Sequence, residues 1–303
     1  MTSGMDIMSA ARSNRHHDVR SLIEGGVDPC TQDDGGMTPM LWACRFGHKR
    51  VVEVLVDAGV DLNQRDRKGR TPLRTACRYR QGKLLRRLVQ LGAWVDQVNP
   101  AGSTALMAEA ERDNPDIVQL LIGLGANPNH VNAKGDSILF RAARVNQVSS
   151  VSILVRLGVQ VNYPNHYGVT PLMIAAQRGS LESIRWLLSG GAFLDLQDQE
   201  GMTALMKAAY HNHLDVAQEL LLCGANPYIR SREGHTAVIL NRAFEPIVMA
   251  FFQMMASRSM TMLIPIPIGS ETEVFPLADA KAPSEEHLVP EVTSSTSNER
   301  PVH

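Results

Sequence analysis

Short apolar stripes recur along the chain at helical spacing, and each follows a segment of small residues. Val51, Val52, Val54 and Leu55 form one stripe, and residues 184–188 form another. Such a stripe predicts an amphipathic helix that buries one face. Pairs of small residues precede the stripes, at 43–44, 76–77, 142–143, 175–176 and 208–209. Because small side chains allow close approach, we expect a first helix at each pair and a second helix at each stripe.

These helix pairs repeat every 33 residues without insertion. The units are marked by Thr38, Thr71, Thr104, Ser137, Thr170, Thr203 and Thr236, each preceded two residues earlier by a glycine. A second glycine follows the first six markers by 21 residues, from Gly59 to Gly224. The first glycine suits a tight turn with positive φ, and the threonine suits a helix N-cap. The second glycine suits the left-handed residue that ends the second helix.

The pattern resembles the ankyrin repeat, whose 33-residue unit combines a β-turn with two antiparallel helices. The resemblance covers about residues 5–256, and the segment from Asp57 to Cys77 matches well. The family's histidine after Thr-Pro-Leu is absent, and its place is taken by Leu41, Arg74, Met107, Phe140, Met173 and Met206. The resemblance implies an all-α type repeat solenoid, a stack of helix-turn-helix units with short β-hairpins.

The ends of the chain depart from the repeat. Residues 1–30 are interpreted as an N-terminal half or capping repeat, and residues 31–258 as seven ankyrin-like repeats that include a C-terminal cap. The capping helix is expected from Glu245 to Met255, because an array exposes its last apolar face unless a modified unit covers it. Residues 259–303 are rich in Ser, Thr, Glu and Pro, which predicts a disordered acidic tail.

Charge is distributed unevenly along the 303 residues. The whole chain has 30 basic and 31 acidic residues, a net charge of −1, which excludes a globally basic nucleic-acid binder. Between Arg45 and Gln90, however, thirteen basic residues face four acidic ones, a local net charge of +9. This segment is either a solvated face or a binding surface.

The resemblance implies a partner site on the concave side, formed by hairpin tips and the ends of the first helices. Arginine and aromatic residues gather at these positions, and both are enriched at interfaces. The candidate partner-binding residues are Arg45, Phe46, Arg67, Lys68, Arg70, Arg78, Tyr79, Arg112, Arg144, Arg178 and Tyr210.

The sequence has no nucleophile elbow, Walker A loop, HExxH motif or dinucleotide fingerprint. We therefore expect no enzymatic activity, no cofactor and no small-molecule substrate. Cys44 and Cys77 share a repeat position that is normally buried, which favours core packing over a reactive thiol. His211 and His213 are two residues apart, a spacing that does not place two side chains on one helical face, and no ligand cluster is near. No metal site is predicted.

Glu109 stands where five other units have alanine. A buried carboxylate is costly unless it is paired. Three interpretations remain open: Glu109 pairs with a neighbour such as Arg74 or Arg141, or it loosens its unit, or it is a functional carboxylate.

The predicted function is a non-enzymatic scaffold or adaptor that binds an acidic segment of a protein partner. A regulatory inhibitor of an enzyme or transcription factor is the alternative, and nucleic-acid binding through the basic segment is disfavoured. We expect a monomer in the cytoplasm or nucleus, without a membrane span. Asn63 and Asn129 lie in segments that resemble acceptors of the asparagine hydroxylase of ankyrin repeats; the alternative is a plain turn asparagine.

Overall fold

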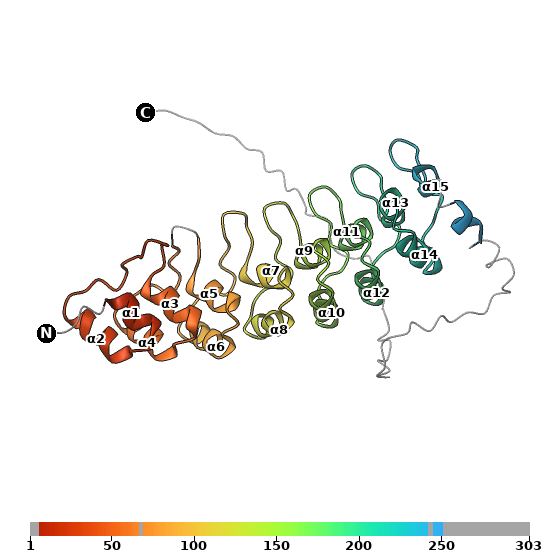
Figure 1. Ribbon diagram of the computed structural model, residues 1–303. Helices are drawn as coiled ribbons and strands as arrows, with labels where there is room; N and C mark the ends of the chain where they lie inside the picture. Colours follow the sequence, from red (N-terminus) through yellow and green to blue (C-terminus); the bar gives the residue numbers. More distant parts are fainter. Residues whose placement is uncertain (1–5, 67–68, 242–244, 251–303) are drawn as a thin grey trace, which may run out of the picture. The chain divides into compact units, whose positions relative to one another are not determined.

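The structure is a computed structural model that describes residues 6–66, 69–241 and 245–250 (Figure 1). Internal contacts divide the chain into residues 1–258 and 259–303, and every described residue lies in the first unit. Residues 245–250, within the expected capping helix, are helical. The rest of that expected helix, Arg67, Lys68 and the expected tail lie outside the described residues.

The helices come in pairs along the array. The first members are α1 (Ile7–Arg12), α3 (Pro39–Phe46), α5 (Pro72–Arg78), α7 (Ala105–Ala110), α9 (Ile138–Arg144), α11 (Pro171–Arg178), α13 (Ala204–Tyr210) and α15 (Ala237–Leu240). The second members are α2 (His16–Glu24), α4 (Lys49–Asp57), α6 (Gly82–Gln90), α8 (Pro115–Gly123), α10 (Val148–Arg156), α12 (Leu181–Ser189) and α14 (Leu214–Leu222). This confirms the expected helical solenoid with a 33-residue unit.

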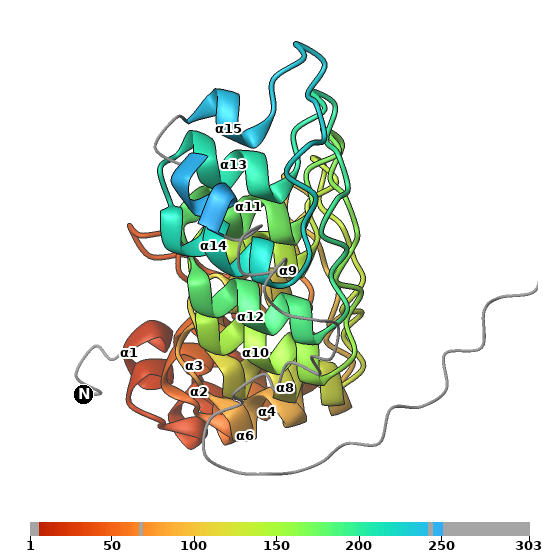
Figure 2. The ribbon, with the colours of Figure 1, turned by 90° about the vertical axis from the view of Figure 1, so that its right-hand side faces the viewer.

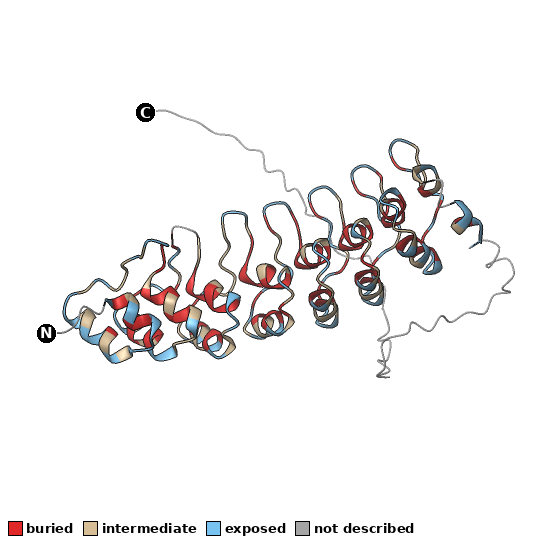
Figure 3. Cartoon of the chain, in the orientation of Figure 1, coloured by how far each residue is buried: buried red, intermediate tan, exposed pale blue. Residues whose placement is uncertain are grey.

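Helices of the same kind pack in rows. First helices contact first helices, as in α3 with α5 and α11 with α13, and second helices contact second helices, as in α10 with α12. The loops that precede the first helices gather along one side of the stack (Figures 1 and 2). One fully buried leucine recurs every 33 residues in the second row, at Leu55, Leu88, Leu121, Leu154, Leu187 and Leu220. The buried residues line the inner faces of both rows (Figure 3).

Hydroxyl caps begin the first helices. The Thr38 hydroxyl accepts a hydrogen bond from the backbone N–H of Leu41 at 3.2 Å. Thr71, Thr104, Ser137, Thr170, Thr203 and Thr236 cap their helices in the same way. The capping role predicted for these residues is confirmed.

The resemblance predicts short β-hairpins, and this expectation is wrong for the described residues. They form turns between the helices and contain no strand. The turn before α3 is closed by the backbone N–H of Asp33, which donates to the Met37 carbonyl at 3.0 Å. The Asp33 carboxylate also accepts from the N–H groups of Gly35 and Met37. Successive turns share single backbone bonds, such as Ala133 N–H to the Ala101 carbonyl at 3.2 Å. Such isolated bonds do not build the ladder that defines a strand.

Side chains at the start of the second helices tie neighbouring units together. The Gln81 amide donates to the Arg45 carbonyl at 3.0 Å, and the Gln147 amide donates to the Glu111 carbonyl at 3.1 Å. His48 and His213 make the equivalent contacts. Asn114 occupies the same repeat position, but its side chain bonds to Glu109 and Arg80 instead of to a carbonyl of the preceding unit.

Candidate functional site

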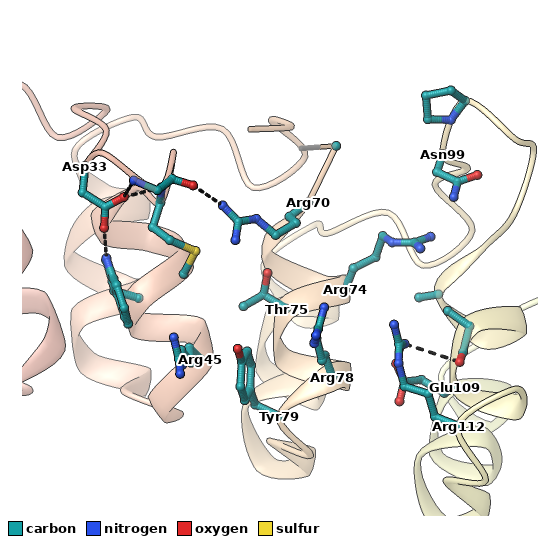
Figure 4. A pocket seen from close by; sticks show the side chains of 17 residues that line it. Asp33, Arg45, Arg70, Arg74, Thr75, Arg78, Tyr79, Asn99, Glu109 and Arg112 are labelled. Atoms are coloured by element: carbon teal, nitrogen blue, oxygen red, sulfur yellow. Dashed lines mark hydrogen bonds and ion pairs between the residues drawn. The ribbon is translucent and has the colours of Figure 1, made fainter. Parts of the chain in front are cut away.

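A pocket of about 490 Å³ opens along the row formed by α3, α5 and α7 and their preceding turns (Figure 4). We name it the arginine pocket after the residues that line it: Arg45, Arg70, Arg74, Arg78 and Arg112. Asp33 and Glu109 are the carboxylates in the described lining, so this lining has a net charge of +3. Asp33 lies at one end of the pocket and Glu109 at the other, with Thr75 between them (Figure 4).

Aromatic rings hold one of these arginines in place. The Arg45 guanidinium lies 5.0 Å from the centre of the Trp42 ring and 4.8 Å from that of Tyr79. Arg12 covers Trp42 as well, at 4.4 Å, and the Trp42 indole N–H donates to Asp33 at 2.8 Å. Cation–π contacts orient a guanidinium without neutralising its charge. Arg45 therefore keeps its charge for a ligand.

α5 contributes two further cations from one face. Arg74 and Arg78 are four residues apart, the spacing that places side chains one above the other on a helix. Arg74 donates to the Ser103 carbonyl at 3.0 Å. Burial lowers the pKa of Arg74, the nearby cations Arg112 and Arg141 lower it further, and the Glu109 carboxylate raises it in part. Among the described residues neither Arg74 nor Arg78 has a carboxylate partner.

Of the three interpretations of Glu109, pairing with a neighbour is the one that the structure supports, although the partner is Arg112 and not Arg74 or Arg141. Glu109 is buried, with 1% exposure, and its carboxylate accepts from the Arg112 guanidinium and from the Asn114 amide, each at 2.6 Å. Arg141 pairs with Glu111 instead. α7 ends at Ala110, so the chain turns directly after it and returns residues 112 and 114 to the carboxylate. Glu109 is thus a paired structural group.

The predicted partner-binding residues divide into groups. Arg45, Arg70, Arg78, Tyr79 and Arg112 come together in the arginine pocket. Phe46 lies beside it, exposed and stacked on Trp42 at 5.9 Å between ring centres. Arg144 pairs with Glu111 at 2.9 Å, and Arg178 is exposed.

A second groove, of about 680 Å³, lies near the C-terminal end of the array and is lined by Tyr210, Lys207, His211 and Arg232, among others. The two histidines do not share a helix: His211 follows α13 and His213 precedes α14. Their rings nevertheless stack across this turn, with centres 6.4 Å apart. Burial lowers the pKa of His211, and the neighbouring His213, Lys207 and Arg178 side chains lower it further. No three His, Cys, Asp or Glu side chains in the described residues gather as metal ligands would.

Trp42, Arg74 and Thr75 line the arginine pocket but were not singled out from the sequence as site residues. Arg74 offered a signal, because the same repeat position holds Leu41, Met107 and Phe140, which are all buried. A charged residue among buried apolar equivalents is costly, and this marks Arg74 as unusual. Thr75 and Trp42 carry no such signal, since their repeat position also holds Ala108, Arg141 and Ile174.

The basic segment does not form one surface. Arg45, Arg74 and Arg78 belong to first helices, whereas Arg50 and Arg86 belong to second helices. Several cations of the segment are already engaged: Arg87 pairs with Glu53 at 2.7 Å, and Arg70 pairs with Asp66 at 2.5 Å. The described cations of this segment are therefore divided among first helices, second helices and the turns between them.

Thiol reactivity is expected to follow burial. Burial raises the pKa of Cys44 and of Cys77 far above the ordinary value, and the nearby Glu109 carboxylate raises that of Cys77 further. Both are buried in the core, as predicted, whereas Cys30 is half-buried and Cys223 is exposed. We expect an alkylating reagent to modify Cys223 and Cys30 in the folded protein, and Cys44 and Cys77 only after unfolding. Peptide mass spectrometry reads the result, and modification of native Cys77 as fast as Cys223 would contradict it.

The candidate hydroxylation sites bridge neighbouring units. The Asn63 carboxamide oxygen accepts from the Trp94 N–H at 2.8 Å, and that of Asn129 accepts from the Gln160 N–H at 3.4 Å. Hydroxylation of these residues stays a prediction. If it occurs, co-expression with the hydroxylase adds about 16 Da, one oxygen atom, to the peptide that contains either asparagine. An unchanged mass at both sites would leave them as structural turn residues.

Comparison with known proteins places the array in a family. The family model for ankyrin repeats (3 copies) matches residues 7–99, 83–165, 105–198 and 162–231. No curated protein matches the chain. Within the described residues, every helix is too short or too polar to cross a bilayer.

Two solved structures show the same fold. The ankyrin repeat domain of Bcl-3, described as a unique member of the IkappaB protein family, is 24% identical, with a TM-score of 0.65 over 71% of this chain and 99% of that domain. The human ASB11 ankyrin repeat domain is 25% identical, with a TM-score of 0.61 over 74% of this chain and 100% of that domain. Because the family model matches segments from residue 7 to residue 231, more than half of the sequence, this chain belongs to the ankyrin repeat family, whose arrays generally mediate protein–protein interaction.

Proposed function

We propose that the chain is a non-enzymatic scaffold or adaptor that binds an acidic segment of a partner protein at the arginine pocket. The observation that carries this proposal is the cluster itself. Five arginines from three successive repeats converge beside Trp42 and Tyr79, and Arg45, Arg74 and Arg78 have no carboxylate partner among the described residues. Arginine and aromatic side chains are the usual anchors of protein interfaces.

A protein partner fits this pocket better than a nucleic acid does. A nucleic acid needs cations that follow its backbone over many phosphates, whereas the unpaired arginines here are confined to one pocket with acidic groups at both ends. Asp33 and Glu109 would repel a continuous phosphate backbone. We place the protein in the cytoplasm or nucleus as a monomer, as part of the same proposal.

The test compares the partners of matched variants. Arg45→Glu with Arg78→Glu reverses two charges in the arginine pocket, and Arg50→Glu with Arg86→Glu reverses two exposed charges on second helices. Each full-length protein is expressed in cells and purified after nuclease treatment, and its partners are quantified by mass spectrometry. Melting curves establish that both variants are folded.

We expect a group of proteins to bind the wild type and the second-helix variant and to fall by about tenfold or more with the pocket variant, since reversing interfacial charges costs several kcal/mol. Equal partner sets for the two variants would refute the proposed surface. Partners that appear only in a parallel purification without nuclease would favour nucleic-acid binding instead.

A further inference from the structure

The arginine pocket contains a buried hydroxyl without a partner. Thr75 on α5 is 5% exposed, and its hydroxyl makes no hydrogen bond within the described part of the chain. Burying an unpaired hydroxyl costs free energy, and such groups call for a specific explanation. The side chain lines the pocket, between Arg70 and Tyr79 in Figure 4. A hydroxyl in the pocket wall without a partner can bond a group that enters the pocket when the side chains that cover it move aside.

Positive charge surrounds this hydroxyl from two helices. Thr75 and Arg78 are three residues apart on α5, Arg74 adjoins Thr75 in sequence, and Arg45 reaches toward Tyr79 from α3. The partly buried Arg74 also feels the repulsion of Arg112. An anion in the pocket would relieve this repulsion and satisfy the hydroxyl at the same time.

We propose that the arginine pocket binds the phosphoryl group of a phosphoserine or phosphothreonine in the partner's segment. This inference rests on the proposed function, and it specifies that the bound acidic segment is phosphorylated. A phosphoryl group carries a charge of about −1.5 to −2 and three acceptor oxygens, whereas a carboxylate carries one charge and two oxygens. The pocket offers many hydrogen-bond donors, namely the guanidinium groups of Arg45, Arg74 and Arg78 and the Thr75 hydroxyl. The two oxygens of a carboxylate cannot accept from all of them.

The carboxylates of Asp33 and Glu109 do not occupy the middle of the pocket, where the phosphoryl group would bind. Glu109 is held by Arg112 and Asn114, and Asp33 accepts from Trp42 and from its own turn. Both lie at the ends of the pocket in Figure 4, away from the hydroxyl. Tyr79, which is 38% exposed, and Trp42 provide aromatic walls for the chain that carries the phosphoryl group.

The first experiment uses the full-length chain and three fluorescent peptide pools of about eleven residues, with acidic residues enriched at all variable positions. The pools differ only at the central residue, which is phosphoserine, glutamate or serine. Fluorescence anisotropy gives the dissociation constants. We expect the phosphoserine pool to bind about tenfold or more tightly than the glutamate pool, because of its extra charge and oxygen.

The outcomes separate the two proposals. Equal binding of the phosphoserine and glutamate pools, both tighter than the serine pool, would overturn the phosphoryl assignment and leave acidic-segment binding in place. Binding of none of the pools would overturn the phosphoryl assignment; together with equal partner sets for the two charge-reversed variants it would also refute the proposed function.

The second experiment tests the residues. Thr75→Val removes the hydroxyl and keeps the shape, so we expect about fivefold to tenfold weaker binding of the phosphoserine pool with an unchanged or higher melting temperature. Arg78→Gln should weaken binding by about tenfold or more. Arg86→Gln is the control, since Arg86 is exposed on α6, in the second row of helices, and lies outside the pocket. Phosphoserine binding that is unchanged by Thr75→Val and Arg78→Gln, or weakened equally by Arg86→Gln, would overturn the assignment.

Discussion

Replacing Arg112 with methionine is expected to lower the free energy of unfolding by about 2–3 kcal/mol, because it leaves the buried Glu109 carboxylate without its counter-charge. The Arg112 guanidinium lies 2.6 Å from Glu109, whose side chain is 1% exposed. Asn114 would remain as its hydrogen-bond donor, and a neutral amide does not replace a cation. Arg112 itself is 43% exposed, which places the expected loss at the lower end for buried pairs. Urea unfolding followed by circular dichroism measures the change.

The same substitution should cost less than about 0.5 kcal/mol in a Glu109→Ala background, since the carboxylate is then absent. Glu109→Ala restores the residue found at Ala43, Ala76 and Ala142. It also frees the amide N–H of Asn114, whose oxygen accepts from Arg80, to donate to a carbonyl of the preceding unit as Gln81 does. Arg178→Met, at the equivalent exposed position, is the matched control. Equal losses for Arg112→Met in both backgrounds would mean that the ion pair does not stabilise the array.

Replacing Gly201 with valine is expected to destabilise the protein by about 3–5 kcal/mol, for two reasons that add. The backbone at Gly201 has φ +75°, a conformation that a β-branched residue rarely adopts. An added Cβ would also lie 2.7 Å from the backbone nitrogen of Arg232, which donates to the Glu200 carbonyl at 3.0 Å. The substitution therefore strains one turn and breaks its bond to the next.

Gly125→Val separates the two causes. Gly125 has φ +93° after α8, but a Cβ there would meet no atom within 4 Å. Its expected cost is about 1–3 kcal/mol, from backbone strain alone. Thermal unfolding of both variants, followed by circular dichroism, measures the difference. If Gly125→Val costs as much as Gly201→Val, the contact between successive turns contributes nothing to stability.

The fold could be predicted from the repeat because each residue that marks a unit has one local physical role. Thr38 and its equivalents cap helices, and the leucines of the second row are buried once per unit. The prediction of β-hairpins failed because local sequence does not decide whether a turn forms strands. Turns and hairpins share the same glycine and threonine, and only the bonds between units distinguish a strand ladder from isolated contacts.

The site was predictable to the extent that register places residues on one row. Arg45, Arg78 and Tyr79 were found in this way. Register does not show which charges are already neutralised: Arg144 has a carboxylate partner, and Arg78 has none among the described residues. It also does not show that the Thr75 hydroxyl is buried without a partner, since that depends on the packing of α3 and α7 around α5.

Site-specific photo-crosslinking tests most directly whether a partner binds at the arginine pocket. The photoreactive residue p-benzoylphenylalanine replaces Tyr79 or Phe46 at the pocket, or Trp94 or Phe193, which are exposed and follow second helices. Each variant is irradiated in cells, and the crosslinked peptides are sequenced by mass spectrometry. The predicted result is crosslinks from Tyr79 and Phe46 to acidic segments of partner proteins, with none from Trp94 and Phe193. Crosslinks from Trp94 and Phe193, with none from Tyr79 and Phe46, would contradict the proposed binding surface.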